Sequence, residues 1–329
     1  MTTYRGIKGF NIQTVSSDPP APFAGQVWYN STSGTVKYFA VQPASWSTGG
    51  NLTTARRYLA GAGTQTAGLA FGGESPGSAL ENATEEYGGT SWTNGGNLGT
   101  ARQNIAGCGT QTTGLAFGGE ASPGVSGSTE EYDGSSWTNG GAMSTGRKRL
   151  AGSGTQTAGL ASGGFAGPPE QESIKTEEYN GSSWTNGGNL TTGRQKLAGC
   201  GTQTAGLAFG GNADPVTAAT EEYDGSSWTN GGNLNTGRQD LAGAGTQTAG
   251  LAIGGGGNAV PITGATEQYD GTSWTNTTSM TTARTQLAGA GTTTAGLAFG
   301  GTLSPSNEQG VSTEEFSAGG PATFTVGTD

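Results

Sequence analysis

A unit of about 45 residues recurs six times along the chain, and it constrains the fold more than any other feature. Each unit contains a tryptophan, and an arginine lies ten residues after it. The tryptophans are Trp46, Trp92, Trp137, Trp184, Trp228 and Trp274, and the arginines are Arg56, Arg102, Arg147, Arg194, Arg238 and Arg284. Gly-Thr-Gln-Thr-Ala-Gly-Leu-Ala-Phe-Gly-Gly follows, as in residues 63–73, and then Thr-Glu-Glu-Tyr, as in residues 84–87. A period of this length is typical of a propeller blade or of a helical repeat.

Local chemistry excludes the helical alternative. The chain has 65 glycines, and its apolar residues follow the two-residue alternation of strands. Each unit offers four short strands, such as residues 194–199, 205–209, 220–223 and 227–229, and an Asp-Gly turn joins the last two. Four antiparallel strands repeated six times predict an all-β fold, a six-bladed β-propeller over residues 46–329.

The predicted strands exceed the number that six blades need by one. If residues 322–326 form the last strand, residues 56–329 supply all four strands of six blades, and the strand at Trp46 is surplus. Either Trp46 completes the last blade in place of 322–326, or both strands lie in that blade. A third alternative is a seventh, incomplete blade, formed by residues 26–30, 35–39 and 45–47. We favour six blades.

The order of these landmarks resembles a known motif. An apolar strand that ends in Gly-Gly, then a tyrosine, then a tryptophan about five residues later is similar to the kelch repeat. The resemblance covers residues 46–329. The near-identity of the copies, with Gly-Thr-Gln-Thr-Ala-Gly-Leu-Ala-Phe-Gly-Gly and Asp-Gly-Ser-Ser-Trp, also resembles tail-fibre or tail-associated repeat proteins of marine, cyanophage-type bacteriophages. The two resemblances imply a kelch-like propeller that belongs to a virus particle.

Residues 1–45 lack the repeat, and we expect an extended segment followed by a β-hairpin. The proline-rich residues 18–22 form a stiff, extended run. Residues 26–30 and 35–39 flank a Ser-Thr-Ser-Gly turn, which predicts the hairpin. This hairpin is similar to segments near the start of phage fibre and tail proteins. It can cap an open edge of the propeller, attach the propeller to a larger assembly, or do both.

The net charge of −10 argues against two classes of partner. Nucleic acids and anionic membranes are bound by basic surfaces, so we expect neither as a partner. No apolar run approaches the length of a membrane span, and residues 1–6 lack the apolar core of a signal peptide. We therefore expect assembly in a host cytoplasm, a final location in the virion, and no membrane insertion. A homo-oligomer is compatible with the sequence.

The sequence offers little to catalysis. It contains no histidine, which removes the commonest general base and metal ligand, and we expect no enzyme, cofactor or metal. Cys108 and Cys200 occupy equivalent positions of two repeats, where the other four repeats carry alanine or serine. A position that accepts these three residues is a small buried site, so we interpret both cysteines as packing residues.

The repeated arginines have two interpretations. Six arginines around one axis would repel one another unless they are paired, so we expect each to bridge to a glutamate of a Thr-Glu-Glu-Tyr segment. Arg238, for example, can reach Glu221 or Glu222 of the preceding unit or Glu267 of its own. The alternative is a ring of arginines that binds an anion at the mouth of the channel.

One segment of each unit does not repeat. It is the loop between Gly-Gly and Thr-Glu-Glu-Tyr, and the six loops are residues 74–83, 120–128, 165–175, 212–219, 256–265 and 302–312. Strand order places all six on one face of the propeller, where repeat proteins carry recognition. The candidate recognition residues are Glu74, Leu80, Phe165, Pro168, Glu170, Ile174, Asp214, Ile262 and Leu303.

These observations predict a non-enzymatic structural or adhesion protein of a phage particle. It would bind a protein or glycan of the host surface, or a neighbouring virion protein, through the variable loops. The alternative is a carbohydrate-binding lectin propeller with one equal site per repeat. A purely structural protein without a ligand is a third possibility.

Overall fold

Strands form every regular element of this protein that the structure describes. The computed structural model describes residues 12–167, 170–257, 261–306 and 308–326. All elements in these residues are β-strands, and most belong to four-stranded antiparallel sheets, which confirms the all-β prediction. The chain divides into two units, of which unit 1 comprises residues 1–44 and 318–329 and unit 2 comprises residues 45–317.

Unit 2 contains six four-stranded antiparallel sheets in its described residues, which we number in chain order. Sheet one consists of β5 (Ala60–Gly63), β6 (Gly68–Phe71), β9 (Thr84–Tyr87) and β10 (Trp92–Asn94). Sheet two consists of β11 (Ala106–Gly109), β12 (Gly114–Phe117), β15 (Thr129–Tyr132) and β16 (Trp137–Asn139). Sheet three consists of β17 (Ala151–Thr155), β18 (Ala158–Ser162), β21 (Thr176–Tyr179) and β22 (Trp184–Asn186). Sheet four consists of β23 (Ala198–Gly201), β24 (Gly206–Phe209), β25 (Thr220–Tyr223) and β26 (Trp228–Asn230). Sheet five consists of β27 (Ala242–Thr246), β28 (Ala249–Ile253), β29 (Thr266–Tyr269) and β30 (Trp274–Thr277). Sheet six consists of β32 (Ala288–Gly291), β33 (Ala295–Phe299), β35 (Thr313–Ser317) and β4 (Ser45–Thr48).

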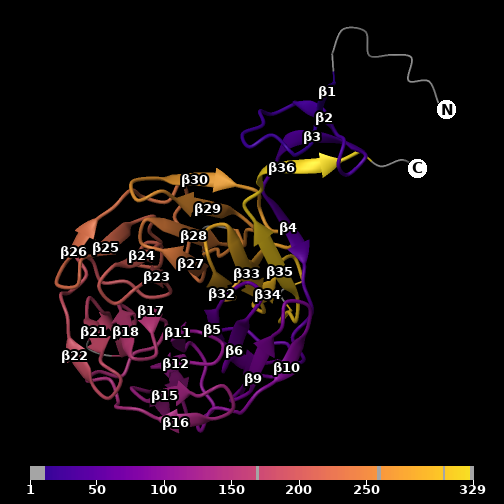
Figure 1. Ribbon diagram of the computed structural model, residues 1–329. Helices are drawn as coiled ribbons and strands as arrows, with labels where there is room; N and C mark the ends of the chain where they lie inside the picture. Colours follow the sequence, from indigo (N-terminus) through magenta and orange to yellow (C-terminus); the bar gives the residue numbers. More distant parts are fainter. Residues whose placement is uncertain (1–11, 168–169, 258–260, 307, 327–329) are drawn as a thin grey trace. The chain divides into compact units, whose positions relative to one another are not determined.

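The sheets of unit 2 have a propeller-like arrangement. Figure 1 shows them around a common centre, with β5, β11, β17, β23, β27 and β32 innermost. Each inner strand contacts the inner strand of the next sheet, and β32 contacts β5. These strands read Ala-Gly-x-Gly because they approach closely: a Cβ atom on Gly243 would lie 2.7 Å from the carbonyl oxygen of Gly199. Small residues at the centre thus explain part of the high glycine content.

The strand at Trp46 completes sheet six. β4 pairs with β35, with Trp46 opposite Phe316, and the two rings pack 5.1 Å apart. Residues 320–325 form β36 (Gly320–Thr325), which pairs with β3 (Thr35–Gln42) in unit 1. Trp46 therefore takes the place that residues 322–326 would have had, and the chain after residue 317 belongs with the N-terminal residues.

Unit 1 is a four-stranded sheet in the order β1 (Gln13–Val15), β2 (Val27–Asn30), β3 and β36. The hairpin of β2 and β3 is antiparallel, and β1 joins β2 in parallel. Trp28 is fully buried, and its indole N–H donates to the Asp18 carboxylate (3.0 Å). Asp18 also accepts from the side chains of Asn30 and Lys37, and these hydrogen bonds lower the pKa of Asp18 to about 2.

Polar side chains of the repeat join each sheet of unit 2 to its neighbour. The indole N–H of Trp228 in sheet four donates to the Thr176 hydroxyl of sheet three (2.9 Å), and the side chain of Gln203 donates to the carbonyl of Tyr179 (2.7 Å). All six repeat tryptophans make the same contact to a threonine of the preceding sheet. Five of them are buried, and Trp137 is half-buried. Trp-Thr and Gln-backbone contacts therefore explain why these residues repeat.

A tyrosine–glutamate contact joins the same sheets. The Tyr223 hydroxyl donates to the second glutamate of the preceding sheet, Glu178 (2.5 Å), and four other junctions repeat this contact. The junction of sheets five and six differs, because Phe316 lacks the hydroxyl and Gln268 replaces the glutamate. The Gln268 amide instead donates to the carbonyl of Thr293 (2.9 Å). The two departures from the tyrosine–glutamate pair thus fall at equivalent positions of one junction.

We expect Gln268→Glu alone to lower the free energy of unfolding by about 1–3 kcal/mol, because the new carboxylate faces a carbonyl and has no hydroxyl donor. Adding Phe316→Tyr should recover this loss by restoring the pair found at five junctions. Urea unfolding of both single variants and the double variant measures the coupling energy. Strictly additive effects would show that the two positions do not interact.

The junction tyrosines predict a loss of stability at high pH. Burial and the hydrogen bond to glutamate raise the pKa of these five side chains from 10 to about 12; they are Tyr87, Tyr132, Tyr179, Tyr223 and Tyr269. Between these values the folded protein keeps protons that the unfolded chain loses, so the free energy of unfolding should fall as the pH rises from about 10 to about 12. Urea unfolding across this range measures the slope. Tyr223→Phe should make the slope shallower, and an unchanged slope would contradict the assignment.

Candidate functional site

The repeat arginines are structural. Arg194 donates to the carbonyls of Gly210 (3.0 Å) and Ala219 (2.7 Å) and to the first glutamate of its own repeat, Glu221 (2.8 Å). All six arginines form this ion pair, at 2.5–3.0 Å, and their side chains are fully buried. Burial lowers the pKa of each guanidinium, and the paired glutamate opposes that shift. Arg238 pairs with Glu267, the own-repeat alternative, so these arginines do not form an anion-binding ring.

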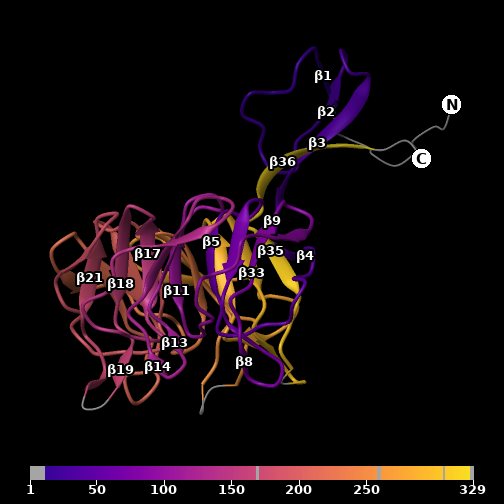
Figure 2. The ribbon, with the colours of Figure 1, turned by 90° about the horizontal axis from the view of Figure 1, so that it is seen from below.

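The non-repeating loops lie together at one end of the sheets of unit 2. Figure 2 shows the hairpin strands β8, β13, β14 and β19 at this end. Three of the six loops contain such a hairpin: β7 (Glu74–Ser75) with β8 (Ala79–Leu80), β13 (Glu120–Ala121) with β14 (Gly124–Val125), and β19 (Phe165–Gly167) with β20 (Glu170–Glu172). We call the surface formed by the six loops the loop face. It brings the variable residues of all six repeats to one side, as expected from strand order.

The predicted recognition residues differ in how they are placed on the loop face. Ile174 and Asp214 are exposed, whereas Leu80, Ile262 and Leu303 are half-buried. Glu170 lies in β20, and Pro168 lies outside the described residues.

Two further candidates take part in contacts within the loop face. Glu74 is buried and forms an ion pair with Arg57 (2.7 Å), so it supports its loop and is not an exposed contact residue. The Lys148 ammonium lies 5.6 Å from the centre of the Phe165 ring and pairs with Glu120 of the neighbouring loop (2.8 Å). The loops of adjacent repeats are thus held together by charged side chains.

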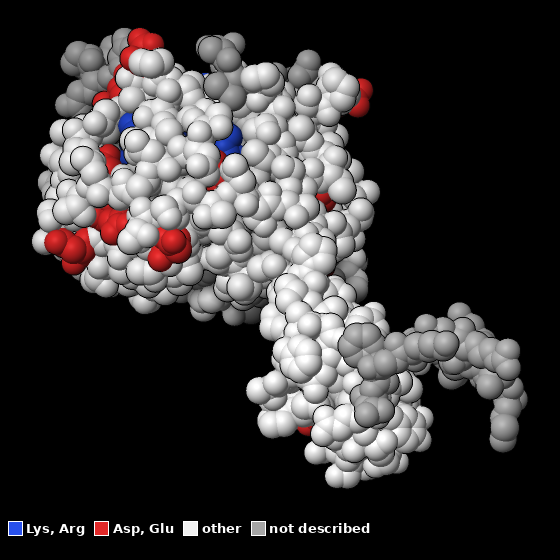
Figure 3. All heavy atoms as spheres, turned by 90° about the horizontal axis from the view of Figure 1, so that it is seen from above, with Lys and Arg blue, Asp and Glu red and all other residues white. Residues whose placement is uncertain are grey.

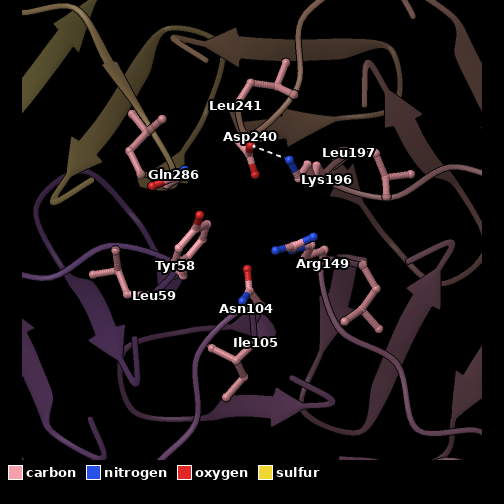
Figure 4. Close-up of a pocket in the computed structure, with 12 residues that line it drawn as sticks. Tyr58, Leu59, Asn104, Ile105, Arg149, Lys196, Leu197, Asp240, Leu241 and Gln286 are labelled. Atoms are coloured by element: carbon pink, nitrogen blue, oxygen red, sulfur yellow. Dashed lines mark ion pairs between the residues drawn. The ribbon is translucent and has the colours of Figure 1, made fainter. Parts of the chain in front are cut away.

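A second set of variable residues, which the sequence analysis missed, surrounds the centre of the sheets. It lies two positions after each repeat arginine and consists of Tyr58, Asn104, Arg149, Lys196, Asp240 and Gln286, which we call the central ring. Their backbone N–H groups donate to one another's carbonyls in sequence at 2.8–3.0 Å, and Tyr58 donates to Gln286. Figure 4 shows these side chains pointing toward a shared pocket, whereas the leucines and the isoleucine that follow them point away. Every repeat contributes its ring residue and the aliphatic residue after it to the lining of this pocket.

The central ring adjoins the loop face. The residue before each ring member pairs with the first residue of the variable loop, as in the bridges between Arg57 and Glu74 and between Lys148 and Phe165. The pocket has a volume of about 120 Å³, and a second hollow of about 90 Å³ lies along the glycines and alanines of the inner strands. The ring thus forms a chemically varied pocket at the centre of a surface bordered by the variable loops.

The backbone of the central ring is strained. All six residues have φ between 52° and 59°, in the left-handed region, where a residue other than glycine costs roughly 1–2 kcal/mol. Elsewhere the repeat uses glycine for positive φ, as at Gly210 and Gly211. Such strain concentrates at functional sites. The sequence contained a signal of the central ring, since six different residue types occupy one position between a fixed arginine and a fixed aliphatic residue.

Charge in the central ring is asymmetric. Lys196 pairs with Asp240 at 3.5 Å, and the neighbouring Arg149 donates to the side-chain oxygen of Gln195 (3.2 Å). Within the described residues, Arg149 forms no ion pair, and its buried Nε atom has no hydrogen-bond partner. Burial raises the pKa of Asp240, and the two cations oppose this shift. Most of the side chains on the face drawn in Figure 3 are uncharged.

Other reactive groups are few in the part of the chain that the structure covers. Cys108 and Cys200 are buried free thiols, and burial raises the pKa of each to about 12. No group of three or more Cys, Asp or Glu side chains in the described ranges could hold a metal ion. The described residues also contain no helix that could cross a membrane.

No family model matches the chain, and no curated protein has a matching sequence. The geometry of unit 2 is therefore the basis for a functional assignment.

We expect Glu221→Gln to lower the free energy of unfolding by about 3–5 kcal/mol, because it leaves the buried Arg194 charge without its counter-ion. Glu308→Gln, at an exposed loop position, serves as the matched control and should change stability by less than about 0.5 kcal/mol. Chemical unfolding measures both. Equal effects of the two substitutions would contradict the structural role of the pair.

Proposed function

We propose that this protein is a non-enzymatic adhesion or structural component of a bacteriophage particle, carried on the tail or fibre. Its loop face would bind a host-surface receptor or a neighbouring virion protein. The observation that supports this proposal is that repeated and varied side chains have different locations in unit 2. The repeated polar side chains join the sheets, whereas the varied side chains gather at one end.

We propose that the six sheets are the blades of one kelch-like propeller. Two features support this count: β4 supplies the fourth strand of sheet six, and β32 lies against β5. The backbone hydrogen bonds of the central ring run from sheet to sheet and return from Gln286 to Tyr58. A six-bladed ring of this kind gives the loops a rigid base.

The contacts of the repeated residues weigh against a lectin with equal sites. Such sites would use repeated side chains, but the repeated tryptophan, glutamine and first glutamate are engaged in contacts within unit 2. The varied residues differ from repeat to repeat, which suits one asymmetric binding surface. A single partner contacted by several unequal loops is therefore the better fit.

We propose that unit 1 attaches the protein to its particle. Seven of the eight large apolar side chains that are exposed in the described residues belong to unit 1: Ile12, Phe23, Val27, Tyr29, Tyr38, Val41 and Val326. Exposed apolar surface of this kind marks interaction sites. The attachment partner would be a neighbouring protein of the same particle.

The proposal predicts that purified phage particles contain this chain, as detected by mass spectrometry, and that the labelled protein binds intact host cells. Replacing residues 165–172 by a Gly-Ser segment of equal length should weaken cell binding at least tenfold. The melting temperature should fall only slightly, because the backbone hydrogen bonds of residue 165 with Lys148 remain available and, among the described residues, only the side-chain contacts of Phe165 and Glu172 are lost.

The matched control is Thr185→Ala in the outer strand β22, which should bind cells like the natural protein. If this replacement and equivalent Gly-Ser replacements of the other five loops all bind cells normally, the loop face is not the recognition surface. Absence of the chain from particles would overturn the virion assignment.

A further inference from the structure

We propose that the central ring binds the carboxylate-bearing end of an acidic sugar, such as a uronate unit. This inference rests on the proposed recognition role of the loop face and names the chemistry that the face would recognise. It begins with the strain of the ring. A chain with 65 glycines places none at six positions whose conformation favours glycine, so the side chains themselves are required there.

The guanidinium of Arg149, which donates to the Gln195 side chain (3.2 Å) and forms no ion pair in the described residues, supplies the carboxylate site. Its planar array of N–H donors matches a carboxylate, and Figure 4 shows it pointing into the pocket. The buried Nε atom lacks a partner among the described residues, as do the Nε atoms of the six repeat arginines; unlike them, Arg149 has no carboxylate partner there. A ligand carboxylate would supply that partner, in addition to the nearby charge of Asp240, which Lys196 already pairs.

The remaining ring members favour a monoanion with hydroxyl groups. Lys196 and Asp240 neutralise each other at 3.5 Å, which leaves a net charge of +1 from Arg149. One carboxylate balances that charge, whereas a phosphate dianion would overcompensate it and leave the ring with a net negative charge. Asp240 is an acceptor for hydroxyl groups, and the Asn104 and Gln286 amides can both donate and accept. Asn104 already donates to Glu120 (3.5 Å) and Gln286 accepts from Thr302 (2.9 Å), but each amide keeps further donor or acceptor capacity that sugar hydroxyl groups could use.

The size of the pocket fits the end of a glycan. A cavity of about 150 Å³ is known to hold a benzene ring, so about 120 Å³ holds one small ring or part of it. Solvent reaches the ring, since the side chains of Lys196 and Asp240 are 19% and 10% exposed. A longer glycan chain could therefore continue outward between the variable loops.

Binding of glucuronate to the full-length protein, measured by calorimetry or ligand-observed NMR, tests the inference. Glucose and acetate are the matched probes, because the first lacks the carboxylate and the second lacks the hydroxyl groups. We expect glucuronate to bind at least tenfold more tightly than either. Equal binding of acetate would reduce the site to a simple anion site and overturn the sugar assignment, as would equal binding of glucose or no binding of glucuronate.

Glycine variants separate ligand binding from folding. Arg149→Gly should weaken glucuronate binding at least tenfold while leaving the melting temperature unchanged or higher, because glycine relieves the left-handed strain. Ser78→Gly is the control, since Ser78 also has positive φ (63°) but lies in a variable loop and outside the central ring. It should bind glucuronate normally. Undiminished binding by Arg149→Gly would overturn the inference.

Cell binding distinguishes this inference from the proposed function. If Arg149→Gly binds host cells normally while the loop replacements do not, the sugar site fails and the recognition role of the loop face stands. If glucuronate binds through Arg149 but the chain is absent from particles and does not bind cells, the virion assignment fails and the sugar site stands.

Discussion

The buried ion pair between the repeat arginine and the first glutamate is the contact on which each repeat depends. In sheet four, the Arg194 guanidinium donates to the carbonyl of Gly210, at the end of one strand, and to the carbonyl of Ala219, just before the next. It also donates to the Glu221 carboxylate. The second oxygen of Glu221 accepts from the backbone N–H of Thr191 (2.7 Å), so the pair also fixes the segment that enters the sheet. A fully desolvated pair of this kind tolerates little change, because each partner alone would be an uncompensated buried charge.

That constraint leaves only certain positions free to vary. The tryptophan, the glutamine and the tyrosine of each repeat contact the neighbouring sheet, so a change at one of them must be matched across the junction. Gln268 and Phe316 are such a matched change. The side-chain contacts of the loops and of the central ring, such as Lys148 with Glu120 and Lys196 with Asp240, differ from junction to junction. Variation in these places alters the chemistry of one surface without disturbing the contacts that hold the sheets together.

Much of the sheet architecture could be predicted from the sequence, because period, hairpin turns and strand alternation are local signals. The arginine–glutamate pairing also followed, since six unpaired arginines near one axis would repel. The pairing of β36 with β3 was not predictable in the same way, because residues about 280 positions apart carry no periodic signal that joins them. The central ring was missed for another reason. Its residues were interpreted as part of an inner strand, and only the structure shows that they have left-handed φ and point to one pocket.

The pairing of β4 with β35 has a consequence for the order of folding during synthesis. In sequence, 268 residues separate Ser47 of β4 from Glu315 of β35. At about 5–20 residues per second, the ribosome needs roughly 13–54 s to make the partner strand after β4 emerges. During that time Trp46 lacks Phe316, and sheet six cannot form. Sheets one to five can assemble as they are made, so the first strand of unit 2 to leave the ribosome is among the last to be paired, and the slow, non-local step falls at the end of folding.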